Sequence, residues 1–195
     1  SDGYPNHAVL DAYAVPNGGT AAPATVATTI TIPLVPERAS AATETSLGSI
    51  GIAVSGAVFF NPYEGDGTSV ALESNFSDAE GNPFLDDCNG HPAPMDGQYH
   101  YHGVPTCITA TIDVPGEHSA IVGYLLDGHP IYGPQDEGGE APSNLDDCLG
   151  HFGPTPEFPE GVYHYHTSTT APYISPCYAG AVDAVMGMPG GPPPM

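Results

Sequence analysis

Apolar residues along this chain fall in short runs that are separated by Gly- and Pro-rich stretches, a pattern typical of β-strands joined by turns. Residues 24–35, ATVATTITIPLV, are β-branched and partly alternating, which predicts one strand or two strands broken near Pro33. Residues 37–47 are small and polar, and they predict a loop or a short helix.

The most informative pattern is an internal duplication. GIAVSGAVFFNPYEGDG from Gly51 aligns without gaps with GYLLDGHPIYGPQDEGG from Gly123. Each segment reads as an apolar strand, a two-residue turn and a second short strand. The Asp127-Gly128 turn is a strong hairpin signal, because both positions of such a turn favour positive φ.

Two shorter motifs repeat downstream in the same order, and each pair of motifs is followed by a cysteine. They are LDDCNGH (85–91) and LDDCLGH (145–151), YHYH at 99–102 and at 163–166, and then Cys107 and Cys177. The spacing between copies changes from one motif to the next, which places insertions in the connecting loops.

This duplication predicts a mainly β fold: a disulfide-stabilised β-sandwich or barrel with an internal pseudo-twofold relation. We expect three parts. They are an N-terminal β-rich segment (1–47) that is a candidate assembly arm, a duplicated domain (48–180) with repeats at 48–107 and 118–177, and a Gly/Pro-rich tail (181–195).

The four cysteines lie inside the repeated motifs and predict disulfides formed in an oxidising compartment. Three pairings are possible; we favour Cys88–Cys107 and Cys148–Cys177, because each closes a loop within its own repeat. Four thiolates on zinc are the alternative, but the close CxxC spacing of such sites is missing. The chain starts Ser1-Asp2-Gly3, as a mature chain does after removal of a signal peptide, although a trimmed chain would start in the same way. A secreted, extracellular or cell-surface protein is therefore expected.

The charge balance excludes one class of partner. The chain has one Lys or Arg residue against 23 Asp and Glu residues, for a formal net charge of −22. Because phosphate binding needs clustered Lys and Arg, a nucleic-acid partner is not expected. No apolar run has the length of a membrane span. Acidic loops at 64–67, 78–82 and 136–140 suit hard cations, so calcium is a candidate there beside the alternative of simple solvated loops.

The histidines of the repeated motifs suggest a metal site. If YHYH is a strand, its two histidines share one face and its two tyrosines share the other. The histidine that ends each LDDCxGH motif would join them once a disulfide holds its turn nearby. The predicted metal ligands are His91, His100 and His102 in one repeat, and His151, His164 and His166 in the other. Three imidazoles suit copper or zinc.

The alternative is that these histidines are structural and donate to neighbouring aspartates. In the metal interpretation, the aspartates orient the imidazoles or bind the ion themselves. Further candidates for either role are His7, His118, Asp86, Asp87, Asp146 and Asp147. His129 follows the second hairpin turn and stands where the first copy has Ala57, so we expect it to be a surface or structural residue.

The chain resembles the YHYH-domain proteins. The stretches that carry the resemblance are SDGYPNHAV, GIAVSGAVFFNP, LDDCNGH, GQYHYH, VGYLLDGHPIYGP, LDDCLGH and PEGVYHYH, which span most of residues 1–180. The resemblance implies the architecture and export, and it draws attention to His7 and His118, which lie in matching stretches. It implies no reaction.

These observations favour an extracellular metal-binding protein, with copper or zinc at the histidines and a binding or structural role. A second hypothesis is a subunit of an extracellular filament or surface assembly that associates through strand 24–35, with metal shared at subunit contacts. A third is a metal-dependent hydrolase or a copper oxidase. No nucleotide-binding or serine-hydrolase motif is present.

Overall fold

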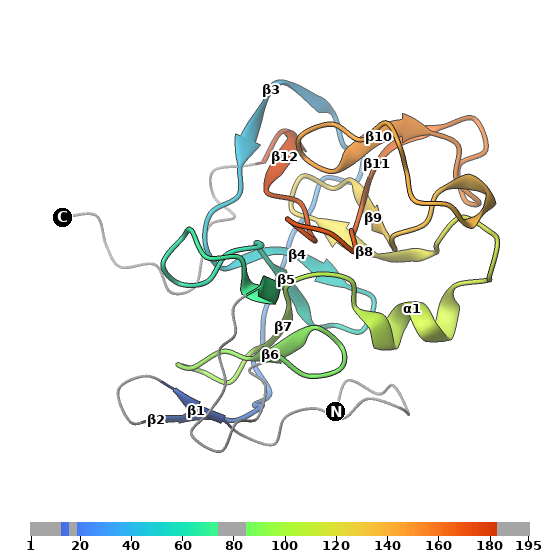
Figure 1. The fold of residues 1–195 in the computed structure, drawn as a ribbon. Helices are drawn as coiled ribbons and strands as arrows, with labels where there is room; N and C mark the ends of the chain where they lie inside the picture. The colour runs from blue at the N-terminus through green and yellow to red at the C-terminus, as the bar shows by residue number, and fades with distance from the viewer. Residues whose placement is uncertain (1–12, 16–18, 74–84, 183–195) are drawn as a thin grey trace.

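The computed structural model describes residues 13–15, 19–73 and 85–182, and these residues form a mainly β protein (Figure 1). His7, the acidic loop at 78–82 and the tail from residue 183 lie outside the described residues. The strands of the main sheet are β4 (Ser49–Ala53), β5 (Val58–Phe60), β6 (Gly90–Pro92), β7 (Tyr99–Tyr101), β8 (Ile121–Leu125), β9 (Pro130–Tyr132), β10 (Gly150–Gly153) and β11 (Val162–His166). The other elements are β1 (Tyr13–Val15), β2 (Gly19–Ala21), β3 (Arg38–Glu44), β12 (Cys177–Gly180), the helix α1 (Thr106–Ile112), and 3₁₀ turns at Ala71–Glu73 and Glu137–Gly139.

The eight strands form one open sheet in the order β10-β11-β9-β8-β4-β5-β7-β6. This order reads the same from both ends once the two sequence copies are matched, with β4 equivalent to β8 and β6 to β10. The copies meet where β4 and β8 pair in antiparallel fashion, with Gly51 opposite Leu125 and Ala53 opposite Gly123. The predicted pseudo-twofold relation is therefore present, and the fold is an open, sandwich-like arrangement rather than a closed barrel.

Both predicted hairpins form, but with a turn other than the expected one. Gly56 and Gly128 have φ of 87° and 83°, whereas the residue before each glycine does not have positive φ. The Gly56 N–H donates to Ala53 O at 2.9 Å, and the Ala53 N–H donates to Ala57 O at 2.8 Å. This is a type I turn followed by a left-handed glycine, which needs positive φ only at the glycine.

Strand alternation separates the tyrosine and histidine faces as the sequence predicts. Tyr101 and Tyr165 are fully buried in the hydrophobic core, where the ring of Phe59 lies 5.9 Å from that of Tyr101. Phe60 points to the opposite face, and its ring stacks on the His100 ring at 3.7 Å. The core and the histidines thus occupy opposite faces of the same strands.

The predicted strand at 24–35 is wrong: residues 22–37 form no strand, and the strand lies instead at β3, within the segment expected to be loop or helix. Three prolines (Pro23, Pro33 and Pro36) explain the shift, because proline has no N–H to donate to a sheet. β3 begins two residues after Pro36 and pairs with β12, and this ribbon packs on the second repeat. The filament hypothesis thereby loses the strand on which it depended.

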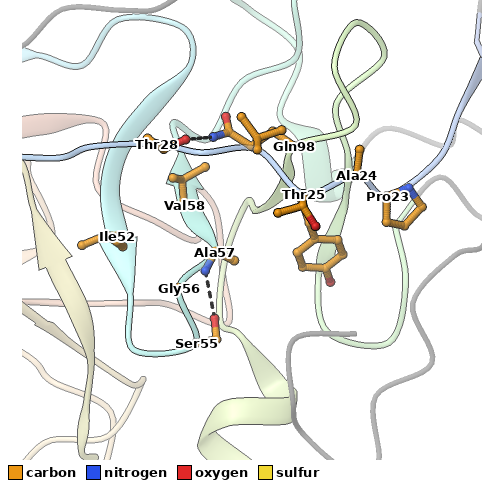
Figure 2. A pocket seen from close by; sticks show the side chains of 12 residues that line it. Pro23, Ala24, Thr25, Thr28, Ile52, Ser55, Gly56, Ala57, Val58 and Gln98 are labelled. Carbon is orange, nitrogen blue, oxygen red and sulfur yellow. Dashed lines mark hydrogen bonds between the residues drawn. The ribbon is translucent and has the colours of Figure 1, made fainter.

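The extended segment instead runs beside the first hairpin and bonds the connection between β6 and β7. The Ala24 N–H donates to Gly97 O at 2.9 Å. The Gln98 side chain donates to Thr28 Oγ1 at 2.8 Å (Figure 2). A cavity of about 330 Å³ remains between the segment and the hairpin, with Ile52 and Val58 among its lining residues. None of the described histidines lines this cavity, so it is separate from the two YHYH strands' histidine face.

Both favoured disulfides are present, Cys88–Cys107 and Cys148–Cys177, and no cysteine in the described residues is free. Each closes a loop within its own copy, over sequence separations of 19 and 29 residues. Within the described ranges, no helix has the length and apolar character that crossing a lipid bilayer requires.

Candidate metal centres

The LDDCxGH motif forms the same tight turn in both copies. The turn leads directly into β6 or β10, and the histidine of the motif is a residue of that strand. In the first copy, the Asp86 carboxylate accepts the N–H groups of Cys88 at 2.9 Å and Gly90 at 3.2 Å. Asp146 holds the second copy in the same way. The residue between Cys and Gly is left-handed in both, with φ of 60° at Asn89 and 59° at Leu149. A disulfide links the turn to α1 in the first copy and to β12 in the second.

The glycine and the first tyrosine of the motifs fit each other. A Cβ on Gly90 would lie 2.4 Å from the Tyr99 hydroxyl oxygen, so only glycine allows the tyrosine to lie across the turn. The Tyr99 hydroxyl then donates to Asp86 at 2.7 Å, and Tyr163 donates to Asp146 at 2.9 Å in the second copy. The repeated residues therefore act as one unit that positions the histidine following the glycine.

The first histidine cluster lies at the β6–β7 end of the sheet. His91 stands directly opposite His100 in the strand register, and His102 follows one residue after β7. The three side chains converge through their Nε2 atoms: that of His102 is 3.2 Å from that of His91 and 3.1 Å from that of His100. All three residues are at most 3% exposed.

The second cluster occupies the opposite end of the strand order, with His151 opposite His164 on β10 and β11. The Nε2 atom of His151 is 3.0 Å from that of His164 and 3.3 Å from that of His166. His118, which precedes β8, brings its Nε2 to 3.3 Å from that of His164. The second cluster thus gathers four imidazoles.

A carboxylate joins the second cluster. The Asp136 oxygens lie 3.7 Å from Nε2 of His118 and 3.8 Å from Nε2 of His151. Asp136 was predicted only as part of an acidic loop, because its approach depends on the turn after β9 and has no local sequence signal. Its carboxylate would offset part of the charge of a bound cation.

The Nδ1 atoms of His100, His102 and the four imidazoles of the second cluster each form a hydrogen bond. In the first cluster, Nδ1 of His100 lies 3.0 Å from Gln98 O, and Nδ1 of His102 lies 2.9 Å from Asn61 O. All four imidazoles of the second cluster show the same arrangement. Their Nδ1 acceptors are Ser119 O for His118, Asn144 Oδ1 for His151, Val162 O for His164 and Gly133 O for His166, at 2.7 to 3.0 Å.

A carbonyl oxygen only accepts, so each of these Nδ1 atoms carries the proton and each Nε2 carries a lone pair. Two Nε2 atoms that lie 3.0–3.3 Å apart and both carry a lone pair repel each other and form no hydrogen bond. Two nitrogens bound to one ion at about 2.0–2.1 Å lie about 3.3–3.4 Å apart at a tetrahedral angle and about 2.8–3.0 Å apart at a right angle, which brackets the observed distances. The spacing of the imidazoles matches a shared cation.

Burial favours the neutral form of the three imidazoles of the first cluster and of His166. Desolvation lowers the pKa of His91 and of His166 to about 3, and lowers the pKa of His102 to about 4. It also holds the pKa of His100 well below its ordinary value. A neutral imidazole is the form that binds a transition metal, so no proton has to be displaced near neutral pH.

The aspartates of the repeated motif have other partners. Asp86 and Asp146 hold their turns and bind tyrosines, and Asp87 and Asp147 are exposed. His129 is structural, as expected, but it is buried rather than on the surface: Nδ1 lies 3.1 Å from Tyr163 O.

The acidic loop at 64–67 supports its own turn, because the Asp66 carboxylate accepts the N–H groups of Thr68 and Ser69 at 2.8 Å. Among the described residues, two groups have metal-ligand spacing: His91, His100 and His102, and His118, His164 and His166 with Asp136 from the acidic loop at 136–140.

Comparison with known proteins identifies the family. The model of the YHYH protein family matches residues 29–141 and 135–180, which together cover most of the chain. No curated protein and no solved structure gives a significant match. The matched residues include both hairpins, both LDDCxGH turns and both histidine clusters. The chain therefore belongs to the YHYH protein family.

Proposed function

We propose that this protein binds two transition-metal ions, copper or zinc, one at each histidine cluster. The first centre is His91, His100 and His102; the second is His118, His151, His164 and His166, with Asp136 beside them. The observation that carries the proposal is the tautomer of six clustered imidazoles. In each of them Nδ1 donates to an oxygen, so the Nε2 lone pair faces the Nε2 atom of a neighbouring ring. The six are His100, His102, His118, His151, His164 and His166.

The alternative of purely structural histidines fits this geometry poorly. In a cluster held by hydrogen bonds alone, one nitrogen of each close pair must donate a proton to the other. The Nε2 atoms of His100 and His102 lie 3.1 Å apart, and both are acceptors. A cation removes the repulsion in both clusters. Imidazole ligands with no available thiolate suit copper(II) or zinc, and Asp136 adds an oxygen to the second centre.

Two disulfides in a chain of this size suit an oxidising compartment, so we place the protein outside the cell. We assign the ions a binding or structural role, because the histidines are buried and lie at the two ends of one sheet. Bound metal would then link β6 to β7 and β10 to β11, because the ligands come from paired strands.

Elemental analysis of protein purified from its native source, without added metal, tests the proposal. We expect about two ions per chain, and we expect addition of copper or zinc to the chelated protein to raise its melting temperature. A ligand at one hundred times its Kd adds about 2.7 kcal/mol to the free energy of unfolding.

Paired variants assign the sites. His91→Gln with His102→Gln should remove one ion, and His151→Gln with His166→Gln should remove the other. The matched control is His129→Gln, which removes a buried imidazole outside both clusters and should keep two ions. A native protein without transition metal, and with no thermal response to copper or zinc, would refute the proposal.

A further inference from the structure

The two centres differ in the aromatic residue that borders them. Phe60 stacks on His100 in the first centre, and Tyr132 occupies the equivalent position in the second. The Tyr132 ring is fully buried, 4.8 Å from the His118 ring and 5.0 Å from the His164 ring, in edge-to-face contact with both. One tyrosine therefore touches two of the proposed ligands.

The hydroxyl of this tyrosine reaches a carboxylate. It donates to Glu157 Oε2 at 2.9 Å and lies 2.9 Å from Thr155 Oγ1. A turn closed by Thr155 and Phe158, whose backbone groups bond each other at 3.1 and 3.2 Å, holds Glu157 in place. Glu157 is exposed, so a proton that it accepts has a route to solvent. The phenylalanine of the first copy has no hydroxyl for such a contact.

The second centre also has a polar edge. The Asp136 side chain is 25% exposed while that of His118 is 6% exposed, so the carboxylate lies at the boundary between the ligands and solvent. This edge is where we expect a small polar oxidant such as hydrogen peroxide to approach the second centre. The phenol lies among the ligands, away from solvent, with its proton directed to Glu157.

We propose that Tyr132 supplies one of the two electrons when hydrogen peroxide is reduced at a copper ion in the second centre. This inference rests on the proposed metal binding, with copper as the metal. Hydrogen peroxide takes two electrons and two solvent protons and becomes two waters. One electron comes from copper(I), which becomes copper(II); the other comes from Tyr132. The phenol loses its proton to Glu157, which returns it to solvent, and a neutral tyrosyl radical remains.

The test uses the full chain loaded anaerobically with copper(I), mixed with hydrogen peroxide, frozen and examined by electron paramagnetic resonance. Copper content is measured first for every variant. We expect a tyrosyl signal in the wild type and at least a tenfold smaller signal per copper in Tyr132→Phe. The control Tyr63→Phe removes a tyrosine near the first hairpin and should leave the signal unchanged.

Two further variants separate electron donation from simple packing. Glu157→Gln keeps the phenol and the copper but removes the proton acceptor, so the radical should form several times more slowly. His151→Gln with His166→Gln should abolish the signal while the first centre keeps its copper.

The outcomes distinguish the two proposals. If the wild type binds no copper, the proposed function fails before peroxide is added, and this inference fails with it. If copper binds but no tyrosyl signal appears, or if Tyr132→Phe gives the same signal, the metal proposal stands and the electron-donor role is overturned.

Discussion

Acid should unfold the metal-free protein at a pH at which most proteins are stable. Four clustered histidines have folded-state pKa values of about 3 or 4: His91, His102, His164 and His166. In the unfolded chain these imidazoles return to about 6.5. The unfolded state therefore binds more protons between these limits, so stability is present above pH 6.5 and is lost as the pH falls towards 3–4.

The magnitude follows from the size of the shifts. Between pH 7 and pH 5, each such histidine lowers the free energy of unfolding by about 2 kcal/mol, since one pKa unit corresponds to about 1.36 kcal/mol. The four groups together would lower the free energy of unfolding by roughly 7–8 kcal/mol, which is comparable to the whole stability of a typical domain, about 5–15 kcal/mol. Carboxylates contribute little in this window because their ordinary pKa values lie lower.

Urea unfolding at pH 7, 6 and 5 in the presence of a chelator, followed by circular dichroism, measures this effect. The slope of the unfolding free energy against pH counts the protons taken up on unfolding. His166→Gln should reduce the slope by about one proton. A free energy that stays constant from pH 7 to pH 5 would show that the imidazoles are accessible to protons in the folded state, and would refute their burial as neutral groups.

Two further predictions concern the hairpins and the buried carboxylate. Gly56→Ala should cost about 1–2 kcal/mol, because a left-handed alanine is strained but its Cβ meets nothing within 4 Å; Gly128→Ala should cost clearly more, because its Cβ would lie 2.6 Å from the Pro33 carbonyl oxygen. Equal losses of urea stability would contradict the packing difference. Asp127→Asn should lower the unfolding free energy by about 2–3 kcal/mol, because the fully buried carboxylate accepts the Tyr165 hydroxyl at 2.5 Å and the Gly180 N–H at 2.9 Å. A change below about 0.5 kcal/mol in the same assay would show that this network adds little.

The sequence predicts the repeated parts of the fold well, because each repeated motif carries its own local geometry. Asp-Gly or Ser-Gly between apolar runs specifies a hairpin, and period-2 alternation in YHYH specifies which side chains share a face. The same alternation brings His100 and His102 together and leaves Tyr101 in the core. The disulfide pairing followed from loop closure within each copy.

Residues outside the repeats, and residues within one repeat that the other copy does not match, were harder to predict. β-branched composition at 24–35 suggested a strand, yet the prolines of that region lack the N–H groups that a sheet requires, and β3 formed from less typical residues because β12 offered a partner. Asp136 and His118 reach the second cluster through tertiary contacts that no local spacing encodes. Whether the clusters formed one centre or two depended on the strand order, which placed them at opposite ends of the sheet.

The pairing of β4 with β8 has a consequence for the origin of the chain. One repeat alone would present β4 as an unpaired sheet edge, and the self-complementary register would let an identical copy bind there. Such a homodimer would already contain the eight strands in their present order. Fusing the two halves makes their association intramolecular and independent of protein concentration. After fusion, each half was free to diverge, as the tyrosine in one and the phenylalanine in the other illustrate.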